Sequence, residues 1–230
     1  GLCWSADLAF GGNGDADRME KIFKAVTGGS YANYIAAGDI DSYTGDAHDS
    51  NVSLLWDDPL LGKCFEETEK HNSDNIPRLI GRYRQLVRRL EQAKDDTAWA
   101  DVNHALLVGQ TLLHKLETMN AMYVAYDSGD REALTMVRNR MIPCMLELVR
   151  NLAASFRRQW LRRNKPFGLE TIQVRFGGMT ARWEETALRL GEYLDGKVDA
   201  IPELATSLEC EKSTGGWGGY RKWASGSTIL

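Results

Sequence analysis

The sequence predicts an all-α protein, an antiparallel bundle of long helices that follows a part with short helices and precedes an irregular tail. Three observations support this prediction. Apolar residues recur at helical spacing over long stretches between residues 73 and 195. Short polar loops separate these stretches, as they do in antiparallel bundles. No segment shows the period-two alternation and the hairpin turns that are typical of a sheet.

Composition narrows the class of protein. The chain has 230 residues, of which 43% are hydrophobic and 26% charged, which is ordinary for a globular protein. Its net charge of -4 argues against a nucleic-acid partner, and no apolar run reaches the roughly 18 residues that cross a membrane. The cysteines and histidines lack metal-ligand spacing, so we expect no metal and no cofactor. Scattered cysteines, interpreted as free thiols, favour a reducing compartment, and we expect a cytoplasmic location.

The first 50 residues carry only short signals. Residues 1–14 are predicted to be a loop, because they end in a run of glycines. A short helix is expected from Asp15 to Thr27, capped by Asp15 or Asp17 and ended by Gly28. One or two helical turns over residues 30–37 and an exposed loop over 38–50 complete this part.

Adjacent carboxylates, Asp57 and Asp58, stand in an otherwise apolar segment. Paired carboxylates occur in glycosidases, so a catalytic role has to be weighed. Neighbouring residues do not face each other on a helix, and Pro59 follows directly, which favours capping of a helix N-terminus. We therefore interpret the pair as a capping element.

Four long helices are predicted, at residues 73–95, 97–127, 131–163 and 168–195. In the third, the apolar stripe is Leu134, Val137, Met141, Met145, Leu148 and Leu152. Pro143 lies inside this helix and predicts a kink near residues 139–143. Residues 209–219 are rich in glycine and predict a linker that leads into the tail.

The corner between the last two long helices is the main candidate site. Pro166 and Gly168 favour a turn there, and several arginines approach it together with Trp160. A glycine pair follows within the last helix and costs roughly 1 kcal/mol per residue relative to alanine, so we expect close backbone approach to a helix or a ligand. The candidate residues are Trp160, Arg163, Asn164, Lys165, Arg175, Gly177 and Gly178.

Two interpretations of this corner stay open. Arginines can hold a carboxylate or sugar hydroxyls, and Trp160 can stack on a sugar ring. Alternatively, the cluster is a solvated helix face, or it contacts the rest of a larger protein, with Arg175 paired to Glu170 or Glu184.

Three segments carry a resemblance to a known family. The sequence NKPFGLE at residues 164–170, followed by VRFGG at 174–178, resembles the C-terminal helical domain of bacterial β-N-acetylhexosaminidases of glycoside hydrolase family 20, the three-domain type. LLWDDPLLG at residues 54–62 resembles the YQDPLLG segment of these enzymes, and residues 223–230 resemble their closing segment.

The resemblance implies an accessory domain. Such enzymes remove terminal N-acetylhexosamine. The acetamido oxygen of the substrate attacks the anomeric carbon, and an adjacent Asp-Glu pair on a catalytic barrel steadies that group and protonates the leaving oxygen. This chain lacks the repeated strand–helix pattern of a barrel and has no Asp-Glu dipeptide, so no catalytic residue is assigned. The implied partners are the catalytic barrel of a parent enzyme, a second subunit in a homodimer, and a glycan reached through the parent, but no nucleic acid or membrane.

Two alternatives to an accessory domain remain. One is a free-standing helical module that binds carbohydrate or protein, and the other is an independent enzyme whose carboxylates the pattern does not reveal. The expected division of the chain is a junction at residues 1–50, a helical bundle at 51–208, and a linker with a docking tail at 209–230.

Overall fold

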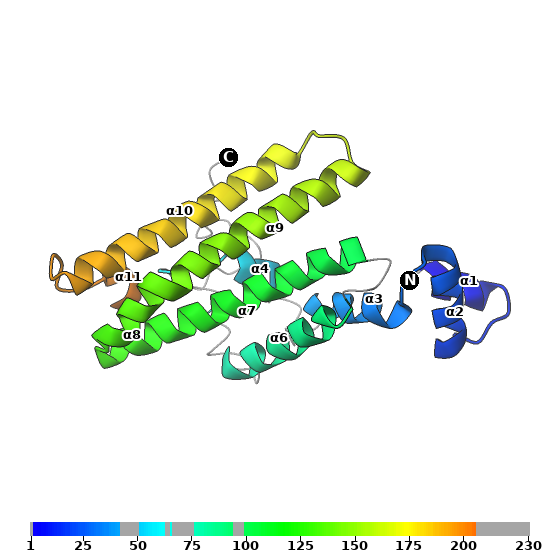
Figure 1. The fold of residues 1–230 in the computed structure, drawn as a ribbon, viewed down its shortest axis with the longest axis horizontal. Coiled ribbons are helices and arrows are strands. Elements are labelled where there is room, and N and C mark those ends of the chain that lie inside the picture. The colour runs from blue at the N-terminus through cyan, green and yellow to red at the C-terminus, as the bar shows by residue number, and fades with distance from the viewer. Residues whose placement is uncertain (1, 42–50, 63–64, 66–75, 94–98, 206–230) are drawn as a thin grey trace, which may run out of the picture.

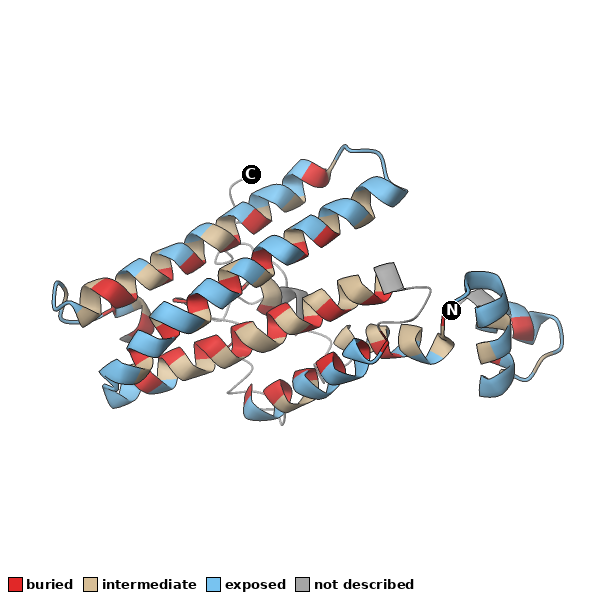
Figure 2. Cartoon of the chain, viewed as in Figure 1, coloured by how far each residue is buried: buried red, intermediate tan, exposed pale blue. Residues whose placement is uncertain are grey.

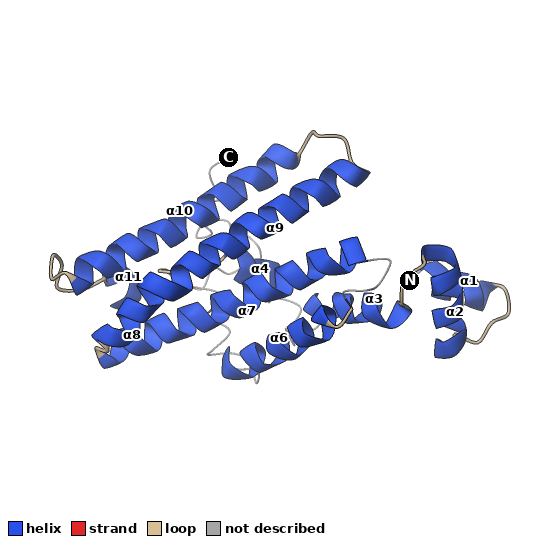
Figure 3. Ribbon diagram, viewed as in Figure 1, coloured by secondary structure: helices blue, strands red, loops and turns tan. Residues whose placement is uncertain are grey.

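The computed structural model describes residues 2–41, 51–62, 65, 76–93 and 99–205. Every regular element among these residues is a helix, and none is a strand (Figure 3). The all-α prediction is therefore confirmed. The expected loop at 42–50 and the expected linker and tail at 209–230 lie outside the described residues.

Four long helices form the body of the molecule: α6 (Ile76–Glu91), α7 (Trp99–Ser128), α9 (Ile142–Arg163) and α10 (Leu169–Leu194). They run alternately up and down, and α6 packs on α7, α7 on α9, and α9 on α10 (Figure 1). Because α7 lies between two neighbours, it buries residues around most of its circumference, whereas α6 and α10 each bury one stripe (Figure 2).

Shorter elements surround this body: α1 (Leu2–Ala9), α2 (Ala16–Thr27), α3 (Tyr31–Gly38), a 3-10 turn (Asp39–Asp41), α4 (Asn51–Trp56), α8 (Arg131–Met136) and α11 (Pro202–Ala205). Helix α3 packs against both α6 and α7, and α4 packs against α7. The loop predicted for residues 1–14 is wrong over α1, because the glycines form only the reversal that follows this helix, with positive φ angles of 84° at Gly11 and 70° at Gly14.

The caps of α2 are those that the sequence predicts. The Asp15 carboxylate accepts hydrogen bonds from the backbone N–H groups of Asp17, at 2.8 Å, and Arg18, at 3.4 Å. Gly28 ends the helix in the left-handed conformation, with φ of 78°. Local side-chain chemistry is thus sufficient to fix both ends of this helix.

A π-helical turn, Val137–Met141, stands where the kink was predicted. Pro143 stands two residues after its last residue and has no backbone N–H to give to the preceding turn. The Met141 carbonyl accepts a hydrogen bond from Nε2 of His114 on α7, at 2.8 Å. Met145 and Leu152 are buried as the sequence predicts, but Ile142 and Val149 are buried in place of Met141 and Leu148.

The segment of residues 54–62 bridges α7 and α10. Its leucines Leu54 and Leu60 are buried in the core. The side chain of Lys115, on α7, is only 1% exposed and donates to the carbonyl oxygens of Leu55, at 2.9 Å, and Asp57. A buried ammonium is costly unless such partners satisfy it, so these two carbonyls tie the segment to α7.

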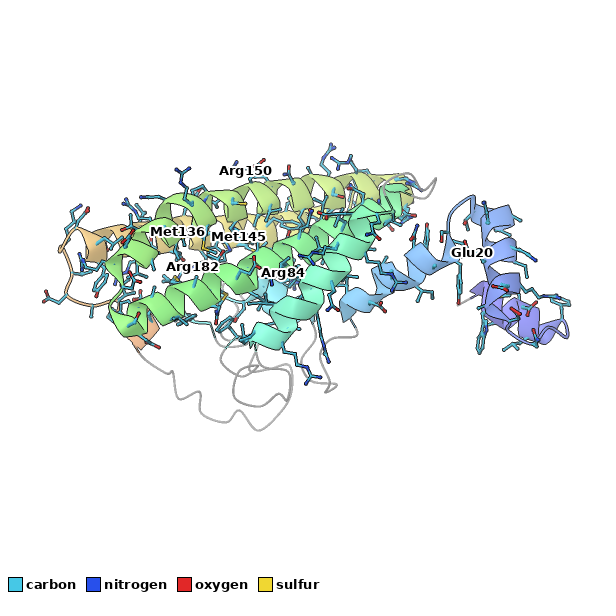
Figure 4. The ribbon with its side chains drawn as sticks, turned by 60° about the horizontal axis from the view of Figure 1, so that its bottom comes forward. Glu20, Arg84, Met136, Met145, Arg150 and Arg182 are labelled. Carbon is cyan, nitrogen blue, oxygen red and sulfur yellow. The ribbon has the colours of Figure 1, made fainter. Side chains whose placement is uncertain are left out.

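Asp58 ties the same segment to α10. Its carboxylate accepts hydrogen bonds from the N–H groups of Leu60, at 2.9 Å, and Leu61, at 3.0 Å. It also forms an ion pair with Arg182, which Figure 4 labels on α10. The predicted helix cap is therefore wrong in one respect: the carboxylate caps a turn, because Pro59, Leu60 and Leu61 form no helix.

A glycine closes this segment for a steric reason. Gly62 has a φ of 47°, and a Cβ atom placed there would lie 2.1 Å from the hydroxyl oxygen of Tyr123. That hydroxyl donates to the Leu60 carbonyl at 3.1 Å, and the Tyr123 ring stacks on Phe65 with centroids 5.4 Å apart. Only glycine fits between the turn and α7.

The contacts between Lys115 and the segment of residues 54–62 allow us to predict the effect of removing the Lys115 ammonium group. Lys115→Met should lower the free energy of unfolding by about 2–4 kcal/mol, because it removes the charged donor that the carbonyl groups of Leu55 and Asp57 share. Arg150→Met, at an exposed position of α9 (Figure 4), should change it by no more than about 0.5 kcal/mol. Urea denaturation of both variants measures the difference, and equal effects would contradict this account of the bridge.

Candidate functional site

The corner between α9 and α10 is built from backbone caps. Asn164 ends α9, with its N–H donating to the Trp160 carbonyl at 2.8 Å. Gly168 begins α10 in a left-handed conformation, with φ of 92°, and its N–H donates to the Glu170 carboxylate at 2.8 Å. The turn that the sequence predicts from Pro166 and Gly168 is present, and both of its ends are fixed.

Trp160 closes the corner from inside. Its indole N–H donates to the Lys165 carbonyl at 2.8 Å, and its ring stacks on Phe156 with centroids 5.8 Å apart. A Cβ atom at Gly168 would lie 3.2 Å from the same ring. The polar end of the indole is therefore occupied by the turn, while Lys165 contributes its carbonyl and leaves its side chain exposed.

Arg163 fastens the end of α9 to the start of α7. Its guanidinium contacts both carboxylate oxygens of Asp101 at 2.7 Å, and the Tyr34 hydroxyl of α3 donates to the same carboxylate at 3.0 Å. Partial burial would raise the pKa of Asp101, but hydrogen bonds from Tyr34 and Arg163, together with the positive charges of Arg163 and Arg162, lower it below its ordinary value. Three helices thus meet at one ionised carboxylate.

A histidine lies one turn along α7 from this carboxylate. Nδ1 of His104 is 3.0 Å from the buried hydroxyl oxygen of Ser155 on α9. Burial lowers the pKa of His104, and the positive charges of Arg158 and Arg163 lower it further, whereas Asp101 opposes them. The neutral imidazole is therefore the form that suits the folded protein.

Arg175 lies over an aromatic ring. Its guanidinium carbon is 6.0 Å from the centre of the Trp56 ring, a cation–π distance. Trp56 meets Phe176 edge-on at 5.2 Å, and Phe176 lies 6.2 Å from Phe156, so aromatic rings connect α4, α10 and α9. Neither Glu170 nor Glu184 forms an ion pair with Arg175 among the described residues, so the alternative pairing that the sequence left open is absent there.

The two glycines of the pair on α10 differ in exposure. Gly177 is exposed, and a Cβ atom placed there would meet nothing within 4 Å; Gly178 is half-buried. The close backbone approach expected at Gly177 is therefore not made by a described part of this chain. Phe167, at the corner, is also largely exposed. This surface thus combines an exposed apolar side chain and open helix backbone with the exposed side chain of Lys165.

The sequence analysis missed a close contact elsewhere on α10. A Cβ atom at Gly191 would lie 2.9 Å from the guanidinium of Arg138, whose Nε donates to the Ala187 carbonyl at 3.2 Å. It also missed Lys115, whose position within an apolar stripe of α7 was the available signal. Arg138 and Lys115 both hold neighbouring parts of the chain together through hydrogen bonds to backbone carbonyl groups.

The described residues contain no cluster of three or more acidic, histidine or cysteine side chains that could hold a metal ion. None of the described helices combines the length and the apolar character needed to span a membrane. The corner uses Arg163, Asn164 and Trp160 to fix its own helices and turns Gly177 and Phe167 outward. This arrangement defines an all-α domain in which the polar groups of the corner fix the domain's own helices.

Comparison with known families places the domain. Residues 32–215 match the family described as the Glycoside Hydrolase 20C C-terminal domain, and the chain belongs to this family. A search of curated proteins found no match. The family resemblance of the sequence is thus confirmed, over a span that includes the corner and the bridging segment of residues 54–62.

The histidine beside the corner gives a pH prediction. Because its pKa is lower in the folded than in the unfolded state, the unfolded chain binds more protons as the pH falls below about 6.5, and stability should fall with it. His104→Gln should lose less stability than the parent protein between pH 7.5 and pH 5.5. Urea denaturation at both pH values measures this difference. Parallel losses in the two proteins would show that His104 contributes nothing to the pH dependence.

Proposed function

We propose that this chain is the accessory C-terminal domain of an exo-β-N-acetylhexosaminidase, which removes terminal N-acetylhexosamine from glycans. The observation that carries the proposal is the family match over residues 32–215. In this role the domain holds no catalytic residue. It supports the catalytic barrel of the parent enzyme, and the glycan is reached only through that barrel. The free thiol of Cys144 agrees with a cytoplasmic location.

We further propose that the corner faces the barrel, either its own or that of a second subunit. Asp101 and Trp160 hold α3, α7 and the corner in fixed positions, which suits a surface that must fit a large partner. Gly177 offers close backbone approach without a side chain in the way. This surface is bordered by Arg175, Asn164, Lys165 and Gly178. The proposal keeps the division of the chain into a junction up to residue 50, a helical bundle at 51–208 and a linker with a docking tail after it.

The proposal predicts where sugar turnover resides. The 230-residue chain should not hydrolyse a chromogenic N-acetylglucosaminide, because the Asp-Glu pair of such enzymes is absent from its sequence. The protein made from the full natural reading frame should hydrolyse it. A spectrophotometric assay of both proteins decides the matter. The proposal would be contradicted if the 230-residue chain hydrolysed the sugar and kept this activity after a second purification. A full-length protein without activity would also contradict it.

The corner can be tested with two helical glycines at which an added Cβ atom would meet nothing within 4 Å in this chain. Gly177→Leu on α10 and Gly81→Leu on α6 should each raise or preserve the melting temperature of the 230-residue chain, because no atom blocks the new side chain and glycine costs about 1 kcal/mol in a helix. In the full-length enzyme only Gly177→Leu should lower the melting temperature and the turnover, because its side chain would meet the partner. Equal behaviour of the two variants there would place Gly177 on plain helix surface.

A further inference from the structure

The first two helices form a hairpin that stands apart from the core. The hydrophobic core of the described residues begins at Ala36, and no side chain of α1 or α2 belongs to it. Helix α2 packs on α3, and Figures 1 and 4 place the hairpin beyond α3, at one end of the long axis of the molecule. The hairpin is thus attached to the bundle without taking part in its interior.

Specific polar contacts nevertheless give the hairpin a defined shape. The buried carboxylate of Asp7 accepts hydrogen bonds from the Gly14 N–H, at 3.2 Å, and from Nε of Arg18, at 2.6 Å. A Cβ atom at Gly12 would lie 2.0 Å from this carboxylate, so the turn needs glycine there. Glu20, labelled in Figure 4, accepts from the Ala32 N–H at 3.2 Å and attaches α2 to α3.

The α1–α2 hairpin buries too few apolar side chains to be stable by itself. Helix α1 has 8 residues and α2 has 12, and helices shorter than about 12–15 residues are marginal without packing. Among residues 4–27, whose burial the structure describes, Met19 is the only large apolar residue of the hairpin that is buried. Trp4 and Leu8, which share a face of α1, are 46% and 43% exposed, and Phe10 and Val26 are 90% and 72% exposed. These apolar groups on a defined hairpin require a covering surface.

The family match indicates which surface covers them. It begins at residue 32 and describes a C-terminal domain, so the remainder of such an enzyme precedes the matched residues. The hairpin lies on this connecting side of the domain, and the α9–α10 corner lies at the same end of the molecule (Figure 1). A partner joined through the same chain also has a high effective concentration, which favours it over a second copy.

We propose that the α1–α2 hairpin is the element through which this domain docks on an apolar surface of the catalytic domain of the same polypeptide. The proposal rests on the proposed function, and it adds the contact residues Trp4, Leu8 and Phe10. A contact between domains buries about 600–1,500 Å², and the exposed apolar side chains of the hairpin form the centre of such a contact.

Hydrogen–deuterium exchange tests the proposal on the full-length natural protein and on the 230-residue chain. Amide exchange over residues 2–27 should be at least roughly tenfold slower in the full-length protein, because docking suppresses local opening of the hairpin. Phe10→Ser should remove most of this protection. Leu188→Ser should retain it, because this exposed leucine lies in the C-terminal part of α10, at the other end of the molecule. Both side chains are exposed in this chain, so neither change should prevent folding.

The outcomes separate the two proposals. If the full-length protein hydrolyses the chromogenic sugar but residues 2–27 exchange equally fast in both proteins, the docking proposal fails and the proposed function stands. Protection that appears in the 230-residue chain alone as its concentration rises would show that a second copy covers the hairpin, which also overturns the docking proposal. A full-length protein without sugar turnover would overturn the function on which both depend.

Discussion

The arrangement of the four long helices depends on the way in which residues 54–62 are held between α7 and α10. Transfer of the Lys115 ammonium and the Asp58 carboxylate from water into the protein costs several kcal/mol for each isolated charge. The structure offsets this cost with backbone carbonyls for the first group and with Arg182 and two N–H groups for the second. Because these directional contacts join three parts of the chain, they fix the position of α10 relative to α7 more narrowly than leucine packing could.

The sequence predicts much of this fold because helical burial is a local pattern. The stripes of α6 and α10, the Asp15 cap and the Gly28 end depend on spacings of a few residues, which are visible in one dimension. The partner of Asp58 is 124 residues away, and that of Arg163 is 62 residues away. No spacing rule reveals such pairs. The helix at residues 2–9 was hidden for another reason: the glycines after it were a stronger signal than its short apolar stretch.

The candidate site shows the same limit in chemical terms. Trp160 and Arg163 are residue types that bind sugars and carboxylates, so the sequence leaves ligand contact open beside a structural role. In the structure the turn occupies the indole N–H, and Asp101 occupies the guanidinium. Other groups of the corner stay exposed, among them the cations Arg157, Arg158 and Lys165 as well as the apolar Phe167. The two side chains whose chemistry most readily suggests a ligand are thus already engaged within the domain.

The π-helical turn has a consequence for the length of the chain. Buried residues of α8 and α9 follow one another at intervals of three or four, except between Val137 and Ile142, where the interval is five. A π turn holds one residue more than an α turn, so it keeps both side chains in phase with the core. The turn therefore fits one residue more into this length of helix than α geometry allows, without rotating the buried face. Deletion of one residue within the turn would leave an interval of four between the two buried positions, which a continuous α-helix spans with the same face toward the core.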